Sequence, residues 1–346
     1  IMISEKKYIS IFPYNVKGYL NNNLFSIKKN KGIEATLFSK LKKDLRKLNI
    51  EINTLDIEIK EQTDLYVYFD LPFPANFSAW KSIIFGKAKK ILICYEPPTV
   101  IPFNYMKPFH IFFKKVYTWN DQLVDNKKYF KINLPKSIEG YKTEPKKFEN
   151  KKFLCLINSN KLPFFPFKIV KHFGKELYSE RIKSIEFYEK FMPNKFFLYG
   201  RGWNKKKKYN LSEKIFGFKK YKCYKGEVKD KIKLLSTFKF CLCFENLGEV
   251  KGFITEKMFD CFKARCVPIY WGASNIDKYI PKKCYIDFRD FNDYKRLSDF
   301  LASIDESKYN GYIKNIESLL SDKKFKKRWF EEGFSEFFVK DVLEIN

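Results

Sequence analysis

One stretch of this chain, residues 238–272, constrains the fold more than any other. Its sequence is FKFCLCFENLGEVKGFITEKMFDCFKARCVPIYWG, and apolar residues occupy every second position from Phe238 to Phe244. This alternation predicts a strand with one well-buried face. After a loop with two glycines, Thr255 is a natural N-cap for a helix whose apolar residues recur at helical spacing, and residues 267–271 return as a strand. The order of strand, helix and strand predicts a βαβ unit.

The crevice of such a unit is a natural site for an anion. The carboxyl end of the first strand and the amino end of the helix meet there, and the helix dipole favours negative charge. Glu245, Asn246, Glu256 and Lys257 fall at this position. Lys257 can neutralise a phosphate, and Glu256 can accept hydrogen bonds from sugar hydroxyls. On residue types alone, a capped surface helix with a solvated lysine explains the pattern equally well.

Four blocks in this region resemble the donor-site signature of glycosyltransferase family 10, the α1,3/4-fucosyltransferases. They are FKFCLCFEN, GFITEK, VPIYWGA with Asn275, and residues 287–291, in the order and spacing of the family. The resemblance implies an α/β protein of the GT-B type, with two Rossmann-like domains facing a central cleft, a GDP-fucose donor and inversion at the anomeric carbon. Bacterial members usually carry Tyr where this chain has Phe253, so a transferase of another GDP-sugar, such as GDP-mannose or a GDP-heptose, stays open.

The resemblance also implies roles for residues outside these blocks. Family members carry a catalytic Glu before Pro, which points to Glu96 at the end of the apolar run ILICY; a strand-terminating Glu is the alternative. A family Arg that contacts the donor phosphates matches Arg181, for which an ordinary helix-surface Arg is the alternative. Trp119 ends a predicted strand and Asn120 follows it, and these two residues are the acceptor candidates. The predicted donor-binding set is Arg181, Tyr199, Arg201, Glu245, Asn246, Phe253, Thr255, Glu256 and Lys257.

A chain of 346 residues suits two domains of about 150 residues each. We predict an acceptor-binding domain at 1–145, a donor-binding domain at 146–325 and a C-terminal segment at 326–346. The polar stretch 135–152, broken by two prolines, is the predicted linker. The carboxyl tail, residues 323–343, is basic and aromatic in its first half. It either packs back as a helix on the N-terminal domain, which we favour, or lies on anionic lipid.

Further elements follow from periodicity and from turn residues. Residues 15–33 are polar and predict a loop. Strands are predicted at 7–14, 64–69, 91–95, 116–119, 153–158, 196–199 and 285–288, and helices at 34–48, 176–191, 229–235, 293–305 and 309–320.

The charge of the chain is strongly positive, with 68 basic and 40 acidic residues and a net charge of +28. Such a balance predicts attraction to nucleic acid, anionic membranes or acidic glycans. The positive residues are spread along the chain, apart from a short run at Lys205–Lys208, and abundant Lys, Asn, Ile and Phe are also typical of AT-rich coding sequence. A basic anion-binding protein is therefore the distant alternative. No nucleic-acid signature is present, and nucleic acid is not an expected partner.

Cysteines, metal motifs and apolar runs limit the remaining possibilities. The eight cysteines lie mostly inside apolar runs, which predicts small buried hydrophobes in a reducing compartment. No Asp-x-Asp occurs, so we expect no cofactor and no metal, with Lys257, Arg181 and the helix N-terminus stabilising the diphosphate. Without a leader or an apolar run of about 18 residues, the protein is expected in the cytoplasm, at most peripheral on the inner face of the membrane.

Overall fold

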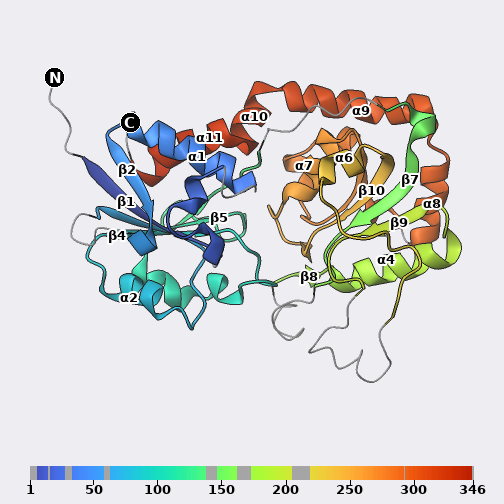
Figure 1. Ribbon diagram of the computed structural model, residues 1–346. Helices are drawn as coiled ribbons and strands as arrows, with labels where there is room; N and C mark the ends of the chain where they lie inside the picture. The colour runs from blue at the N-terminus through green and yellow to red at the C-terminus, as the bar shows by residue number, and fades with distance from the viewer. Residues whose placement is uncertain are drawn as a thin grey trace. The chain divides into compact units, whose positions relative to one another are not determined.

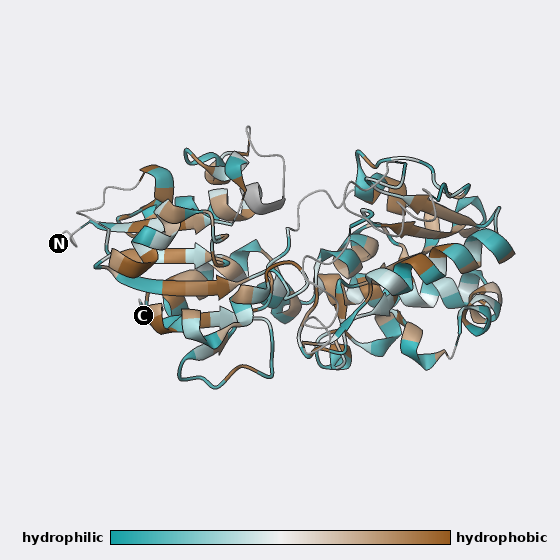
Figure 2. Cartoon of the chain, turned by 90° about the horizontal axis from the view of Figure 1, so that it is seen from below, coloured by the Kyte–Doolittle hydropathy of each residue, from teal (hydrophilic) through white to brown (hydrophobic). Residues whose placement is uncertain are grey.

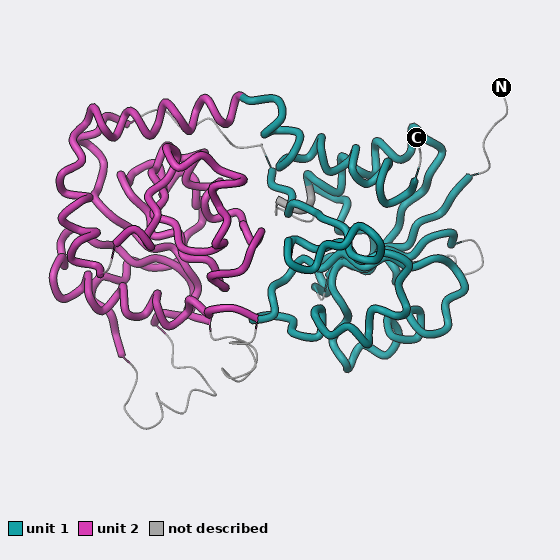
Figure 3. Tube along the Cα trace, turned by 180° about the vertical axis from the view of Figure 1, so that it is seen from behind, with its two compact units in different colours: residues 1–139, 322–346 teal, residues 140–321 magenta. Residues whose placement is uncertain are grey.

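The computed structural model describes residues 6–14, 16–27, 33–57, 63–137, 146–161, 173–204, 219–291 and 293–344. The chain forms two compact units, one of residues 1–139 with 322–346 and one of residues 140–321 (Figure 3). These divisions fall next to the predicted domain boundaries at 145 and 325. Residues 138–145 of the predicted linker and the lysine run at 205–208 lie outside the described residues.

The first unit is built on a six-stranded parallel sheet with the order β2-β1-β3-β4-β5-β6. Its central strand β3 is buried along its whole length, as expected for a strand covered on both faces. The strand order changes direction between β1 and β3, which is where open α/β sheets bind ligands. The strands are β1 (Lys7–Pro13), β2 (Ile50–Thr54), β3 (Leu65–Phe69), β4 (Lys89–Cys94), β5 (Lys115–Thr118) and β6 (Tyr129–Lys131).

Helices cover both faces of this sheet. Helices α1 (Ile33–Arg46) and α11 (Glu331–Phe337) lie on one face, and α2 (Phe77–Phe85) lies on the other (Figure 1). The core joins residues from the strands, from α1 and from the end of the chain, where Phe334 and Phe338 are buried. Helix α10 (Lys323–Trp329) precedes α11 and buries Phe325 and Trp329. The aromatic residues of the C-terminal segment therefore pack inside this unit.

The second unit is built on a five-stranded parallel sheet with the order β13-β12-β10-β7-β9. Its strands β7, β9, β10, β12 and β13 take the same positions in this sheet as β1, β2, β3, β4 and β5 take in the first one. The strand order therefore changes direction between β7 and β10. A short antiparallel pair, β8 (Lys175–Glu176) and β11 (Leu247–Gly248), lies outside this sheet. The sheet strands are β7 (Lys152–Ile157), β9 (Phe196–Tyr199), β10 (Phe238–Phe244), β12 (Val267–Trp271) and β13 (Ile286–Asp287).

Helices also sandwich the second sheet. Helices α4 (Tyr178–Phe191) and α8 (Tyr294–Ala302) contribute buried residues to one face, whereas α6 (Lys231–Leu235) and α7 (Glu256–Lys263) pack on the other. Helix α9 (Glu306–Ser321) packs against α7. Coloured by hydropathy, the sheet strands are largely hydrophobic (Figure 2). The predicted βαβ unit is present as β10, α7 and β12.

Most predicted elements are found within a few residues of their expected bounds, but β2, α2 and β6 were not predicted. Strand β2 lies at the edge of its sheet and alternates buried and half-buried residues. Its five residues include an Asn and a Glu, so the alternation of apolar residues is too short to predict a strand. All eight cysteines are buried and free, as expected. Among the described residues, no helix is both long enough and apolar enough to cross a membrane.

Candidate functional site

The carboxylate of Glu245 organises the amino end of α7. Glu245 follows β10 and is fully buried. Its Oε1 atom accepts a hydrogen bond from the backbone N–H of Thr255 at 2.8 Å. Its Oε2 atom accepts from the Thr255 hydroxyl at 2.6 Å and from the Lys257 ammonium at 3.0 Å. One carboxylate therefore ties the end of β10 to the first turn of α7.

Thr255 occupies the N-cap position of α7, but its side chain does not cap the helix. Its hydroxyl is directed to Glu245 instead. The prediction of the helix start is confirmed. The expected capping bond is wrong, because the Thr255 oxygen accepts from the Lys257 ammonium and not from a first-turn N–H. The first-turn N–H groups, which have no acceptor inside the helix, lie at the positive end of the helix dipole. This end of α7 suits an anion.

Lys257 lies in the first turn of α7, and its ammonium contacts Glu245. Its side chain is 12% exposed, and its ammonium also reaches the Thr255 hydroxyl at 3.1 Å. Burial lowers the pKa of Lys257, but the carboxylates of Glu245 and Glu256 outweigh burial, so the pKa lies above its usual value. Lys257 is therefore charged at neutral pH. The side chain of Glu256 is 46% exposed and lies 3.9 Å from the Lys257 ammonium.

Arg181 joins this cluster from α4 and is buried. Its Nη2 atom donates to the backbone oxygen of Phe244 at 2.7 Å and to Oδ1 of Asn246 at 2.9 Å. The guanidinium lies 4.9 Å from the centroid of the Tyr178 ring, and burial lowers the pKa of Arg181. Arg181 thus holds Asn246 and the end of β10. Its predicted contact with a phosphate stays a prediction.

The loop before α7 is anchored by the strand that follows it. The backbone N–H of Gly252 donates to Oδ1 of Asn275 at 2.9 Å. The Tyr270 hydroxyl donates to the backbone oxygen of Phe253 at 3.2 Å. The Phe253 ring is 1% exposed, so it lies in the protein interior.

Gly272 leaves space that the cluster needs. A Cβ atom at this position would lie 2.6 Å from Cγ of Glu245 and closer still to the Tyr270 hydroxyl. We expect Gly272→Ala to lower the free energy of unfolding by about 1–3 kcal/mol, because Glu245 must move. Gly311→Ala in α9 is the control, since nothing lies within 4 Å of its added Cβ, and a gain of about 0.5–1 kcal/mol is expected. Thermal melts of both variants test this, and an unchanged Gly272→Ala melt would contradict it.

Tyr199 and Arg201 are not gathered around Glu245. Tyr199 is the last residue of β9 and Arg201 follows it, and β7 separates β9 from β10 in the sheet. The Arg201 side chain is 83% exposed, with Glu227 at 3.6 Å. The parallel strands place these residues at the same carboxyl edge as Glu245, but no described contact joins them. Their predicted donor contacts stay predictions.

In the first unit, Glu96 follows β4 and is half-buried. Its backbone N–H donates to Oδ1 of Asp70 at 3.0 Å, and its backbone oxygen accepts from the Tyr105 hydroxyl at 2.9 Å. Asp70 Oδ1 also accepts from the backbone N–H of Tyr95 at 2.6 Å and from Nδ2 of Asn104 at 2.6 Å. The buried carboxyl group of Asp70 therefore fixes the backbone around Glu96. The role of Glu96 as a base is not tested by this placement.

The acceptor prediction needs one correction. Trp119 is fully buried, and its ring packs against Tyr105 with a centroid distance of 5.7 Å. Its indole is part of the core and offers no surface to an acceptor. Asn120 is half-buried, and its Oδ1 accepts from the backbone N–H of Gln122, so it stays a candidate.

Two buried carboxyl groups at these strand ends were missed in the sequence. Asp70 follows the apolar run of β3 and is fully buried. Glu176 accepts hydrogen bonds from the backbone N–H groups of Tyr178 and Ser179 and from the Ser179 hydroxyl at the start of α4. A carboxylate directly after a buried strand indicates a functional position at the carboxyl edge of a sheet. This pattern points to Glu96 after the apolar run ILICY, and it points equally to Asp70 after β3.

One group of side chains in the described part of the chain has the spacing of a metal site. The sulfur atoms of Cys241, Cys243 and Cys261 lie within 4.8 Å of one another. Metal binding requires thiolates, whereas burial raises the pKa of the Cys243 and Cys261 thiols. Hydrogen bonds from neighbouring thiols lower the pKa of Cys241, so that sulfur is already used within the cluster. These residues fit the expected small apolar packing better. The expectation of chemistry without a metal stays a prediction.

Comparison with known proteins tests the family resemblance. Residues 198–329 match the model described as glycosyltransferase family 10 (fucosyltransferase), C-terminal domain. Over these residues the chain is similar to glycosyltransferase family 10. The matched part of the chain includes the Glu245 cluster and begins after Arg181. The α-(1,3)-fucosyltransferase FucT of Helicobacter pylori is 35% identical over 86 residues, which is 25% of this chain and 18% of that protein. The first curated relatives are matched over only 18 to 22% of their own length.

Solved structures resemble the whole chain in fold. A crystal structure of an α1,3-fucosyltransferase has a TM-score of 0.54 at 17% identity, covering 100% of this chain and 92% of that one. Anabaena HepE, solved with UDP-glucose, has a TM-score of 0.57 at 11% identity, covering 99% of this chain and 100% of that one. With two parallel α/β units, the chain has the predicted GT-B fold.

Proposed function

We propose that this chain is an inverting glycosyltransferase that moves L-fucose from GDP-fucose to a hydroxyl group of a glycan acceptor. The expected product is an α1,3 linkage on a cell-surface polysaccharide or lipopolysaccharide. The observation that carries the proposal is the cluster of Glu245, Thr255 and Lys257 at the start of α7, within the residues that match the family. The H. pylori relative is itself named an α-(1,3)-fucosyltransferase.

The donor diphosphate is proposed to bind at the amino end of α7. The uncapped first turn supplies backbone N–H groups, and the ammonium of Lys257 supplies a charge. An ammonium has three N–H groups, and two of those of Lys257 serve Glu245 and Thr255. The exposed carboxylate of Glu256 is placed to accept hydrogen bonds from hydroxyl groups of the sugar or ribose. Arg181 supports this site by holding Asn246.

The proposed chemistry is a single displacement. The carboxylate of Glu96 removes the proton of the acceptor hydroxyl as its oxygen attacks the anomeric carbon. The bond from that carbon to the phosphate oxygen breaks, and GDP leaves with charge that the α7 end and Lys257 stabilise. One displacement inverts the anomeric configuration. No metal is assigned a role, and added chelator is expected to leave the rate unchanged.

Two variants test the proposed roles in a transfer assay with GDP-fucose and a glycan acceptor. Glu96→Gln is expected to keep GDP binding and to lower kcat by about 10²–10⁴, because the base is lost. Lys257→Ala is expected to lower kcat/KM by about two orders of magnitude, or about 3 kcal/mol. Lys295→Ala on α8, whose side chain is 77% exposed, is the control and is expected to act as the wild type. Normal transfer by Lys257→Ala would refute the donor site.

The alternatives give different results in the same assay. A transferase of another GDP-sugar would hydrolyse or transfer GDP-mannose or a GDP-heptose in preference to GDP-fucose. Phe253 motivates this comparison, because its ring is buried and has no hydroxyl to offer a donor. A basic anion-binding protein would show RNA affinity that falls steeply with salt and no turnover of any nucleotide sugar.

A further inference from the structure

The first unit exposes a group of large apolar side chains that its core does not use. Of the twelve exposed large hydrophobic residues among those described, seven lie between residues 73 and 112. Three of them project most of their surface, with Phe77 80% exposed, Phe85 73% and Ile111 74%. We call this group the α2 face; its members are Phe73, Phe77, Ile84, Phe85, Met106, Ile111 and Phe112.

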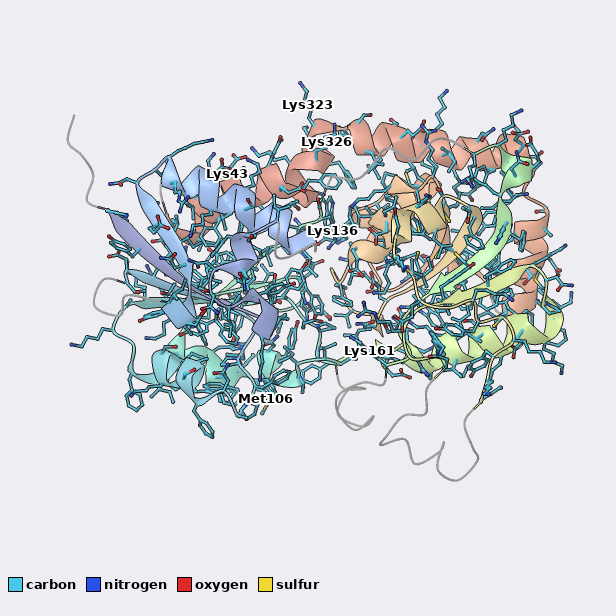
Figure 4. All side chains as sticks on the ribbon, in the orientation of Figure 1. Lys43, Met106, Lys136, Lys161, Lys323 and Lys326 are labelled. Carbon is cyan, nitrogen blue, oxygen red and sulfur yellow. The ribbon has the colours of Figure 1, made fainter. Side chains whose placement is uncertain are left out.

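The members of the α2 face lie on two segments that contact each other. On α2, Phe77, Ile84 and Phe85 share the outer side of the helix with Lys81, whereas Ala79 and Ile83 are buried toward the sheet. The outer side of a surface helix is normally polar. Ring contacts join α2 and the residues just before it to residues 102–112. The Trp80 and Phe109 centroids are 5.5 Å apart, and the Phe73 and Phe103 centroids are 6.2 Å apart. Met106, labelled in Figure 4, lies on the same side of the unit as α2.

Within residues 71–115, the exposed charged side chains of the α2 face are all positive. Lys81, Lys87 and Lys107 are exposed within or beside it. From residue 71 to residue 115 the sequence contains a single acidic residue, the half-buried Glu96. Exposed aromatic and aliphatic side chains interspersed with lysines and free of carboxylates are the composition of surfaces that bind anionic lipid bilayers.

We propose that the α2 face is a membrane-binding surface that inserts its apolar side chains among the headgroups of an anionic bilayer. Self-association is the less favoured occupant, because two copies of this face would bring lysines against lysines with no carboxylate to pair them. The protruding side chains also suit a fluid interface better than a rigid partner. The sequence also predicts that the C-terminal tail could lie on lipid. Its side chains Phe325, Trp329 and Phe330 are buried, so these three cannot serve as apolar anchors.

Vesicle flotation with the full chain tests the proposal and needs no transferase activity, so its outcome is separate from that of the proposed function. The chain is expected to float with vesicles of phosphatidylglycerol and phosphatidylcholine, and less with phosphatidylcholine alone. The triple variant Phe77→Ser, Phe85→Ser, Ile111→Ser is expected to lower the bound fraction at least tenfold on the mixed vesicles. Phe191→Ser on α4, where Phe191 is 61% exposed, is the matched control and is expected to bind as the wild type.

Charge variants separate the α2 face from the tail. Lys81→Glu with Lys107→Glu is expected to lower binding to the anionic vesicles severalfold, whereas Lys323→Glu with Lys324→Glu on α10 is expected to leave it near the wild-type level. Thermal melts confirm that each variant is folded. Undiminished binding by the triple variant, or loss of binding in the tail variant alone, overturns the proposal. So does sedimentation showing a dimer without lipid that the triple variant abolishes.

Discussion

Glu245→Ala is expected to lower the free energy of unfolding by about 3–5 kcal/mol. The carboxylate is fully buried and pairs with a lysine whose side chain is only 12% exposed. Its removal leaves a largely buried ammonium without its counter-charge, together with an unpaired N–H and hydroxyl of Thr255. Chemical denaturation of the variant and the wild type measures the difference. Donor binding is expected to fall as well, because the loop before α7 loses its anchor.

A double-mutant cycle shows whether the buried pair causes this loss. Adding Lys257→Met to Glu245→Ala removes the uncompensated cation, so the double variant is expected to be more stable than the sum of the single effects predicts, by about 2 kcal/mol. Glu317→Ala is the matched surface control. Its ion pair with Arg265 spans 2.6 Å between side chains that are 46% and 38% exposed, and a loss of about 0–1 kcal/mol is expected. Additive effects in the cycle would show that Glu245 acts through Thr255 alone.

The part of the site around Glu245 was predictable because it is local in sequence. An alternating pattern gives way to a helical one between residues 238 and 266, and the topology of a βαβ unit then brings Glu245, Thr255 and Lys257 together. The pairing of Lys257 with Glu245 was not predictable, since it depends on side-chain directions within the loop. For the same reason, the expected cap at Thr255 was wrong.

Residues whose environment depends on distant segments were harder to place. Trp119 and Asn120 follow the same strand, yet the indole is buried against Tyr105. Arg181 and Arg201 both looked able to approach a phosphate, but one is buried and the other exposed. Helix α2 escaped prediction because its outer side is apolar, so no amphipathic period marks it. The same apolar residues on the outer side of α2 both remove the amphipathic pattern and leave an exposed hydrophobic face.

The two units place a buried carboxyl group at the same point of their folds. Asp70 directly follows β3 and Glu245 directly follows β10, and these strands are equivalent in the two sheet orders. Each carboxyl group accepts a backbone N–H from a neighbouring segment. Glu245 has a lysine as its partner, whereas Oδ2 of Asp70 is buried without a hydrogen bond.

Asp70 is expected to make the protein less stable as the pH rises from about 4 to about 8. Burial raises the pKa of Asp70 to about 8, and the Glu96 carboxylate adds to the rise, against hydrogen bonds from Tyr95, Glu96 and Asn104. An unfolded Asp releases its proton near pH 4. The folded state thus holds more protons than the unfolded state between these values, so the free energy of unfolding falls with pH. With one pKa unit worth about 1.36 kcal/mol, Asp70 contributes a loss of about 5 kcal/mol.

Asp70→Asn isolates this contribution, because asparagine keeps the Oδ1 acceptor and cannot titrate. Below pH 4 the variant is expected to be less stable than the wild type by about 1–3 kcal/mol, since its amide N–H groups replace a buried oxygen that has no hydrogen-bond partner. Above pH 8 it is expected to be the more stable protein, because only the wild type must then bury a carboxylate beside Glu96. Denaturant unfolding at several pH values measures the difference, and a difference that does not vary between pH 4 and pH 8.5 would show that Asp70 is ionised in the fold.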